Sequence, residues 1–174
     1  MADVWAYFML KSNPQIMYYL PGIKLSTIEE TEKVLIDLME DQRSDNRKFY
    51  FFHIELKSTR ETVGSIGYTV IQNADKEKSV GAGYFIYPHF WANGYTTEAL
   101  ERVLEYAFLE KGVTLVEAEC FAENKGSERV MQKCGMHKDE EYVEYELHDG
   151  EKKLRLRYQL SKSEWVNRNR NPAR

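Results

Sequence analysis

Cysteine and long apolar runs are both scarce in this sequence. The 174 residues include only 2 cysteines, Cys120 and Cys134, which excludes a disulfide framework and provides no metal-ligand spacing. No segment approaches the ~18 consecutive apolar residues of a transmembrane helix. Residues 1–5 carry an acid and no basic residue ahead of an apolar run, which does not favour a signal peptide. We therefore expect a cytoplasmic protein with no metal site and no membrane partner.

An excess of positive charge is also absent. The chain has 24 Lys and Arg against 28 Asp and Glu, a net charge of −4, so it lacks the basic field that holds nucleic acid. It is 43% hydrophobic and 30% charged, which is typical of a globular protein. The length favours one domain, which we place at residues 1–166, followed by a polar tail at 167–174.

The apolar periodicity and turn residues predict an α+β fold. Ser26 and Glu29 fit a capping box, and Ser127 is a candidate N-cap. Asp149-Gly150 is typical of a two-residue hairpin turn. The predicted helices cover 2–11, a segment from Ser26, 94–111 and 127–134, and the predicted strands cover 49–56, 63–71, 80–87, 113–121, 142–148 and 152–160. The strand–helix–strand order of residues 80–121 predicts one parallel crossover in a mostly antiparallel sheet flanked by helices.

One strand-to-helix connection is the most informative segment. A predicted strand ends at Pro88, the chain turns through Gly94, and a long amphipathic helix begins. Free N–H groups at a helix N-terminus favour an anion such as phosphate. An ordinary tight turn gives the same pattern, and no Gly-Lys-Ser/Thr or Gly-x-Gly-x-x-Gly motif is present. The residues alone leave both interpretations open.

Two motifs in this region resemble a known family. Trp91, Gly94, Tyr95, Glu98 and Ala99 match Pro-x-x-Trp-Gly-x-Gly-Tyr-Ala-x-Glu-Ala in register, and residues 123–136 resemble Asn-x-x-Ser…Glu-Lys-x-Gly-Phe. The sequence thereby resembles the GNAT superfamily of acetyl-CoA-dependent N-acetyltransferases, in the form typical of its RimJ/RimL-like branch. Segments 13–20, 63–67 and 158–165 agree with lower specificity, so the resemblance covers nearly the whole chain.

The resemblance implies a GNAT-like fold and acetyl transfer from acetyl-CoA to a primary amine by direct attack. The acceptor is either a protein N-terminal amine or a small-molecule amine. The Ile86 backbone is expected to pair with the pantetheine arm and to donate to the thioester oxygen. Asn124 is expected to hold the cofactor or the splayed strands, and Ser127 to donate to the leaving sulfur. The loop amides expected to cradle the pyrophosphate are those of Trp91, Ala92, Asn93, Gly94, Tyr95 and Thr96.

Plainer roles remain open for two of these residues, because Ser127 also suits a helix N-cap and Asn124 also suits a turn-stabilising side chain. Ala92 replaces the usual first glycine, and Thr96 replaces a small residue. The family usually opens with a strand, whereas this sequence starts inside the first helix, so a first edge strand is missing. These departures support an alternative, a non-catalytic acyl-CoA-binding or interaction module. A homodimer is common in the branch and is expected here.

No residue pattern identifies the general base. Glu117, Glu119 and Glu123 share one face of a predicted strand, but an acidic stripe is typically solvated. The four histidines, His53, His89, His137 and His148, form no cluster in the sequence. Neither cysteine has a visible histidine–acid partner, which argues against a cysteine nucleophile.

Overall fold

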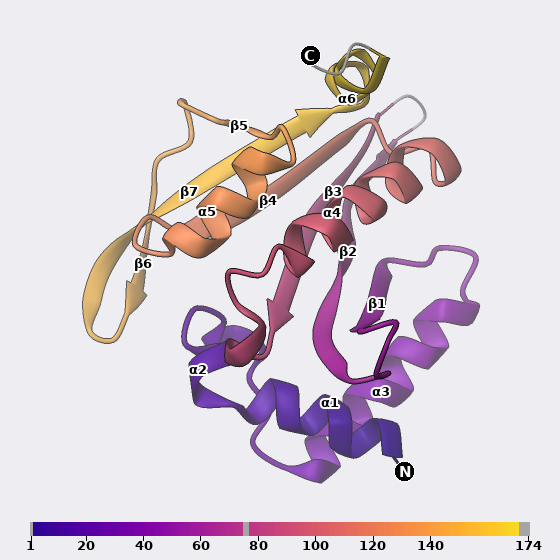
Figure 1. Cartoon of the computed structure of the whole chain (residues 1–174), viewed down its shortest axis with the longest axis vertical. Helices are drawn as coiled ribbons and strands as arrows, with labels where there is room; N and C mark the ends of the chain where they lie inside the picture. The colour runs from indigo at the N-terminus through magenta and orange to yellow at the C-terminus, as the bar shows by residue number, and fades with distance from the viewer. Residues whose placement is uncertain (1, 75–76, 171–174) are drawn as a thin grey trace.

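The computed structural model describes residues 2–74 and 77–170 (Figure 1). Its helices are α1 (Ala2–Ser12), α2 (Pro14–Met17), α3 (Ile28–Arg43), α4 (Tyr95–Glu105), α5 (Lys125–Lys133) and α6 (Lys162–Arg170), with short helical turns η1 (Pro21–Ile23), η2 (Pro88–Phe90) and η3 (Tyr106–Glu110). Its strands are β1 (Phe49–Glu55), β2 (Thr62–Ala74), β3 (Glu77–Ile86), β4 (Leu115–Phe121), β5 (His137–Lys138), β6 (Glu144–His148) and β7 (Glu151–Ser161). This order of helices and strands is the predicted α+β arrangement.

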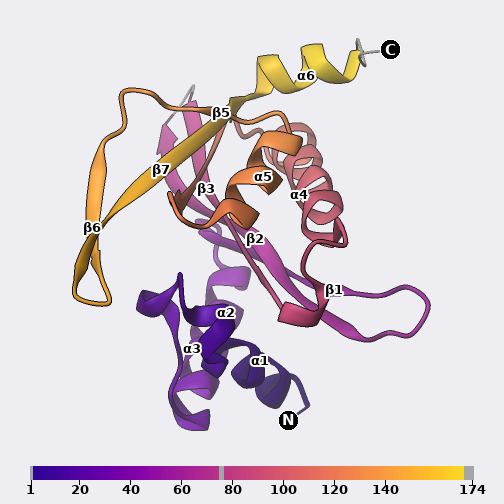
Figure 2. The ribbon, with the colours of Figure 1, turned by 60° about the vertical axis from the view of Figure 1, so that its left-hand side comes forward.

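The strands form one mixed sheet with the order β1-β2-β3-β4-β7-β5, and β6 also pairs with β7. β3 and β4 are the parallel pair, joined through α4, so the predicted crossover is confirmed. Helices α4 and α5 cover one face, while α1, α2 and α3 gather around the lower end in Figure 1. Figure 2 shows the β6–β7 hairpin reaching away from the other strands. The place where β3 and β4 adjoin thus lies between α4 and α5 on one side and the group of α1, α2 and α3 on the other.

The main core lies between the sheet and α4. Leu100 and Leu104 of α4 and Phe108 of η3 are fully buried, one helical turn apart, against Val80 and Val116 of the parallel pair. Burial stabilises the fold by roughly 1.5–3 kcal/mol for each such side chain. Helix α4, which follows the loop of residues 88–94, is therefore fixed against the two strands that it joins.

Two predicted helix caps are shifted in the structure. Thr27, and not Ser26, caps α3, since Thr27 Oγ1 accepts the Glu30 N–H at 3.1 Å. Thr27-x-x-Glu30 satisfies the capping-box pattern as well as the pair one residue earlier does, so the pattern alone does not fix the register. Asn124, and not Ser127, caps α5, with Oδ1 accepting the Ser127 N–H at 3.1 Å. The turn-stabilising interpretation of Asn124 is confirmed.

The end of the chain also differs from the prediction. Residues 167–170 belong to α6 and are not a polar tail, and residues 171–174 lie outside the described part of the chain. Trp165 is buried in the main core, and Arg168 Nη2 lies 2.6 Å from Glu101 Oε2 in α4. These tertiary contacts stabilise a segment whose composition alone is polar.

The predicted hairpin turn is confirmed. Asp149 and Gly150 have positive φ angles of 52° and 78°, as the twist of a two-residue hairpin requires. The helix α2, the strand β5 and the turns η1 and η2 were missed, because segments of two to four residues carry little periodicity.

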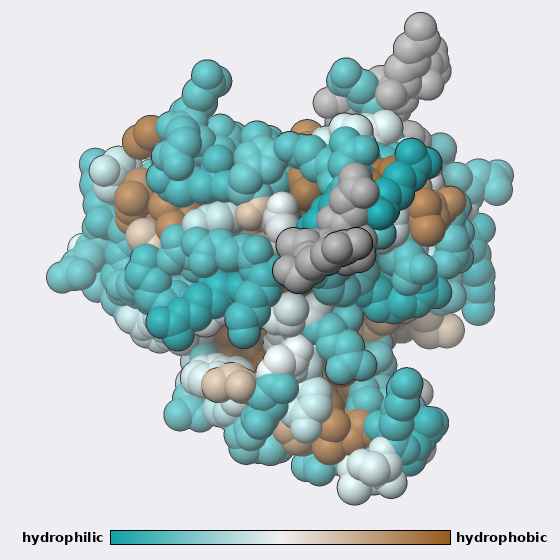
Figure 3. All heavy atoms as spheres, turned by 45° about the horizontal axis from the view of Figure 1, so that its top comes forward, coloured by the Kyte–Doolittle hydropathy of each residue, from teal (hydrophilic) through white to brown (hydrophobic). Residues whose placement is uncertain are grey.

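One edge of the sheet is formed by β1, which within the described residues pairs with β2 alone. The side chains of Phe49 and Phe51 on this edge strand are exposed. Figure 3 shows another face, covered mainly by hydrophilic residues with apolar residues in separate patches. Over residues 2–74 and 77–170, no helix is both long and apolar enough to cross a bilayer.

Candidate functional site

The parallel strands β3 and β4 are paired over only part of their length. β3 and β4 are in register from Ser79↔Leu115 to Ala82↔Ala118. Beyond that point β3 continues alongside β2 and β4 alongside β7, so a wedge opens between residues 83–86 and 119–121. The wedge opens into a cavity of about 1210 Å³, which is large enough for an extended organic ligand.

Two residues of β3 direct backbone groups into this wedge. The Tyr87 N–H donates to the Val63 carbonyl at 3.0 Å, which identifies a hydrogen-bonded pair of the antiparallel β2–β3 ladder. Because such pairs alternate along the strands, the backbone groups of Tyr84 and Ile86 face away from β2 and toward β4. The Ile86 carbonyl is already occupied, since it accepts the Trp91 indole N–H at 3.1 Å. The N–H groups of Tyr84 and Ile86 remain as donors for a ligand in the wedge.

The loop after β3 ends in a helix N-terminus at the same cavity. The first helical bond of α4 runs from the Glu98 N–H to the Gly94 carbonyl at 3.0 Å. The N–H groups of Tyr95, Thr96 and Thr97 therefore have no acceptor inside the helix, and all three residues line the cavity. With the positive end of the helix dipole behind them, these donors suit a phosphate group.

The loop adopts a backbone that normally requires glycine. Gly94 has φ of 87°, and Ala92 has φ of 62°, in the left-handed region that a β-carbon disfavours. The usual glycine at this position adopts a positive φ without strain, whereas the β-carbon of Ala92 makes the same backbone conformation unfavourable. Ala92 and Trp91 line the cavity, whereas Asn93 is absent from its described lining and donates instead to the Trp91 carbonyl at 3.0 Å.

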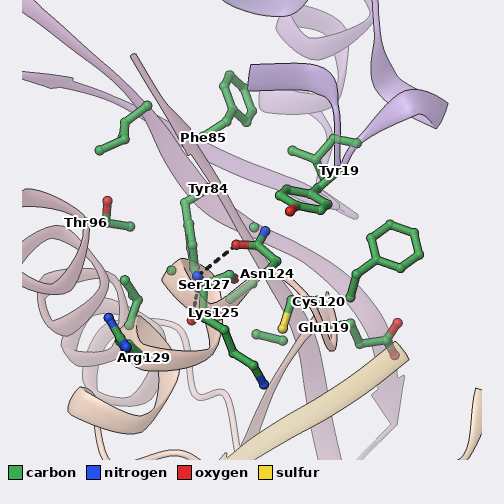
Figure 4. Close-up of a pocket in the computed structure, with 18 of the residues that line it drawn as sticks. Tyr19, Tyr84, Phe85, Thr96, Glu119, Cys120, Asn124, Lys125, Ser127 and Arg129 are labelled. Carbon is green, nitrogen blue, oxygen red and sulfur yellow. Dashed lines mark hydrogen bonds between the residues drawn. The ribbon is translucent and has the colours of Figure 1, made fainter. Parts of the chain in front are cut away.

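Ser127 and Asn124 meet at the start of α5, on the other side of the wedge (Figure 4). Both line the cavity, together with Ile86. Tyr84 reaches across from β3, and its hydroxyl lies 2.8 Å from Ser127 Oγ and 3.1 Å from the Ser127 carbonyl oxygen. The sequence did not suggest Tyr84, although it lies two residues before Ile86 and must therefore share its backbone orientation in a strand.

The acidic stripe on β4 is paired rather than solvated. Glu119 lies 2.8 Å from Arg157 and 3.1 Å from Arg155, and Glu123 lies 2.8 Å from Lys153. Glu117 is different, because its nearest cation is Arg157 at 3.9 Å. All three glutamates line the cavity; Glu117 and Glu119 do so from the face of the sheet opposite α4, and Glu123 from the turn after β4. Glu117 is thus the carboxylate of this stripe with the weakest ionic partner.

The remaining nucleophile and base candidates fit poorly. Burial raises the pKa of Cys120 to about 11 and that of Cys134 to about 12, so both are thiols at neutral pH. None of the four histidines is among the described residues that line the cavity. Among residues 2–74 and 77–170, no group of His, Cys, Asp or Glu side chains could hold a metal ion.

The site as a whole defines a class of protein. The free N–H groups of β3 can pair with an extended chain, and the free N–H groups at the start of α4 suit an anion. Together they suit a long ligand with a phosphate at one end and an extended chain that enters the wedge.

Comparisons with known proteins agree with this class. Residues 1–137 match the family model described as the acetyltransferase (GNAT) domain. The uncharacterised N-acetyltransferase YoaA of Bacillus subtilis is 27% identical over 151 residues, which is 85% of this chain and 81% of that protein. The probable N-acetyltransferase YjcK of the same organism is 31% identical over 114 residues, 65% of this chain and 61% of that protein.

Solved structures share the fold. A spermidine N-acetyltransferase from Vibrio cholerae, in complex with CoA and spermine, has a TM-score of 0.80 at 18% identity, covering 95% of this chain and 94% of that one. A GNAT-family acetyltransferase from Bacillus anthracis has a TM-score of 0.71 at 24% identity, covering 93% and 90%. The chain belongs to the GNAT family of acetyl-CoA-dependent N-acetyltransferases. The family and the fold inferred from the sequence are thereby confirmed.

Proposed function

We propose that this protein acetylates a primary amine by direct attack of the amine on acetyl-CoA, and that it belongs to the RimJ/RimL-like branch of its family. The single observation that carries the proposal is the wedge between β3 and β4, which opens into the same cavity as the free N–H groups of α4. Acetyl-CoA supplies an activated acetyl thioester, and the protein's own groups bind and orient it.

The proposed binding groups follow the length of the wedge. The backbone from Trp91 to Thr96, with the free N–H groups at the start of α4, holds the pyrophosphate. The N–H groups of Ile86 and Tyr84 pair with the pantetheine arm, and the Ile86 N–H donates to the thioester oxygen as that oxygen gains negative charge. Asn124 holds the start of α5 beside the wedge through its cap to Ser127.

Ser127 is the proposed donor to the leaving sulfur. Its hydroxyl lies in the cavity wall next to the wedge, on the side opposite the strand that binds the pantetheine arm. A serine hydroxyl is a poor acid, so we propose that it stabilises the thiolate by a hydrogen bond and does not give up its proton.

For the acceptor we propose a small cationic amine rather than a protein N-terminus. The cavity continues to the other face of the sheet, where Glu117 lies 3.9 Å from its nearest cation, Arg157, and Gly81 lies opposite it in the β3–β4 ladder. A carboxylate there attracts an ammonium group and accepts its hydrogen bonds. The spermidine N-acetyltransferase with a similar fold binds spermine, which supports this choice. The homodimer and the cytoplasmic location expected from the sequence are also part of the proposal.

Thermal unfolding with and without acetyl-CoA tests the cofactor site first. At about 100 times its dissociation constant, a ligand that binds only the folded state adds ~2.7 kcal/mol, or roughly 5–10 °C for a chain of this size. We expect this rise with acetyl-CoA and none with NADH. Absence of any shift over a wide concentration range would support the alternative of an interaction module.

A thiol-release assay then compares acceptors. We expect spermidine and spermine to release CoA faster than a peptide with a free N-terminal amine. The opposite order would overturn the acceptor proposal and leave the acetyl-CoA site intact.

A further inference from the structure

The hydroxyl of Tyr84 has two oxygen partners on a single residue. It lies 3.1 Å from the backbone carbonyl of Ser127 and 2.8 Å from Ser127 Oγ, across 43 positions of sequence. Figure 4 shows the tyrosine ring extending from β3 toward the first turn of α5. The position of Ser127 is also fixed by the Asn124 cap, so both hydroxyl groups are held in place.

A tyrosine hydroxyl has one proton, so it donates to only one of these oxygens at a time. When Tyr84 donates to the carbonyl, Ser127 Oγ–H donates back to the tyrosine oxygen, and its proton points away from the cavity. When Tyr84 donates to Ser127 Oγ, the serine proton is free to point into the cavity. A rotation of the Tyr84 hydroxyl therefore decides whether Ser127 is a donor to a ligand.

The tyrosine keeps its proton over the useful pH range. Burial raises the pKa of Tyr84 above that of an exposed tyrosine, and the Ser127 hydrogen bond opposes this only in part. Cys120, which lines the same cavity, stays protonated as well, because burial raises its pKa to about 11. Neither group places a negative charge next to Ser127 at neutral pH.

We propose that Tyr84 is a positioning residue that makes Ser127 a hydrogen-bond donor to the sulfur of CoA. This inference rests on the proposed function. In the transfer step the amine nitrogen forms the N–C bond, the C–S bond breaks, and its electron pair goes to sulfur. The acceptor reacts as the neutral amine, after its ammonium group has lost one proton to water, and the nitrogen loses a second proton to water as the amide forms. Tyr84 and Ser127 keep their own protons. A chain of two hydroxyl donors stabilises the thiolate more than one does, since each bond polarises the next.

Binding of CoA and desulfo-CoA tests this without knowledge of the acceptor. Calorimetric titration at pH 6.5 to 9.5 gives the ratio of the two dissociation constants, and the change of this ratio with pH reports the pKa of the bound thiol. In the unmodified protein we expect the affinity for CoA, relative to that for desulfo-CoA, to increase about tenfold from pH 6.5 to 9.5, and we call this increase the gain. It corresponds to a pKa of the bound thiol that is lower than that of the free thiol by about 1. We expect Tyr84→Phe and Ser127→Ala each to reduce the gain below threefold, and the double variant to reduce it no further.

Tyr68→Phe is the matched control. Tyr68 lies on the neighbouring strand β2, is fully buried, and its hydroxyl has no hydrogen-bond partner in the described part of the chain. Removal of the Tyr68 hydroxyl should leave the increase in relative CoA affinity with pH unchanged. If Tyr84→Phe does not fold, 3-fluorotyrosine at position 84 replaces it, and its more acidic hydroxyl should increase the gain.

The outcomes separate the two proposals. If neither CoA nor desulfo-CoA binds, the proposed function fails and this inference fails with it. If both bind, and the gain is the same with and without the Tyr84 hydroxyl, the proposed function stands and the role of Tyr84 is overturned. An equal loss in Tyr68→Phe would overturn it as well, because it would show a general effect of buried hydroxyl groups.

Discussion

Arg157 holds one oxygen of Glu119 with two nitrogens: Nε lies 3.0 Å and Nη2 2.8 Å from Glu119 Oε1. Arg155 binds the other oxygen at 3.1 Å, so the charge of this carboxylate is neutralised by the neighbouring strand. Glu119 is therefore a structural ion-pair partner. Glu117, whose nearest cation is Arg157 at 3.9 Å, is the carboxylate that we propose receives a cationic acceptor.

Substitution of these two glutamates should give different results. We expect Glu117→Gln to raise the KM for the amine about tenfold, with an unchanged dissociation constant for acetyl-CoA, because it removes an attractive charge on the acceptor side only. Glu119→Gln should instead lower the free energy of unfolding by about 1 kcal/mol, as a partly exposed ion pair is lost. Steady-state kinetics and urea unfolding measure the two effects. An equal rise in KM for both variants would contradict the assignment.

Ala92 should be a site where glycine stabilises the protein. A φ of 62° destabilises the folded state by about 1–2 kcal/mol when the residue is alanine, and glycine removes this strain. Glycine also gives the unfolded chain more conformational freedom, which lowers the free energy of unfolding by up to ~1 kcal/mol. We expect Ala92→Gly to raise the free energy of unfolding by about 0.5–1 kcal/mol in urea unfolding. Ala99→Gly, inside α4, is the control and should lower it by about 1 kcal/mol. A loss of stability in both variants would show that the loop is not strained.

Gly135 should tolerate alanine poorly. Its φ is 78°, and a β-carbon there would lie 2.6 Å from Arg168 Nη1 and disturb the pairing of Arg168 with Glu101. We expect Gly135→Ala to lower the free energy of unfolding by about 2 kcal/mol. Gly22→Ala is the matched control, because a β-carbon at Gly22 meets no atom within 4 Å. Thermal unfolding of both variants checks the difference, and equal melting temperatures would refute it.

Lys11 should make stability depend on pH. Burial lowers the pKa of Lys11 to about 8 from its usual 10.5, and its Nζ lies 4.5 Å from the centre of the Phe85 ring. Between pH 8 and 10.5 the unfolded chain binds a proton that the folded chain has released, so this lysine makes stability rise with pH in that range. Below pH 8 both states are protonated and the contribution is constant.

The comparison with Lys11→Met isolates this effect from other titrating groups. We expect the stability of the unmodified protein to rise relative to Lys11→Met by up to roughly 3 kcal/mol from pH 8 to 10.5 in urea unfolding. Lys24→Met, at an exposed position, should show a constant difference from the unmodified protein. A constant difference for Lys11→Met as well would mean that Lys11 stays charged in the folded state.

Local sequence was sufficient for much of the fold. The Asp149-Gly150 hairpin and the strand–helix–strand crossover depend on turn chemistry and periodicity within short windows, and both were predicted. The cap of α3 was wrong by one residue because Ser26 and Thr27 both fit the motif. Helix α6 was not predicted, because its polar sequence is stabilised by a distant contact: Glu101 lies 67 positions away from Arg168.

In the candidate site too, features formed by residues adjacent in sequence were predicted, and features formed by contacts between distant residues were not. The loop from Trp91 to Thr96 was identified from residues that are adjacent in sequence, and all of them but Asn93 line the cavity. The ion pairing of Glu119 was missed because Arg157 lies 38 positions away on β7. The contact of Tyr84 with Ser127 was missed for the same reason. No local pattern reports which side chains a parallel crossover brings together.

The wedge is open at one end and closed at the other. At its closed end the backbones of Ala82 and Ala118 are joined in register, and a peptide ladder, unlike a side chain, cannot move aside by changing rotamer. An acyl group that lies between the strands must end before this barrier. The depth to which a ligand can enter between the strands is therefore determined by where the two strands begin to separate, and a deeper wedge would require a new strand register.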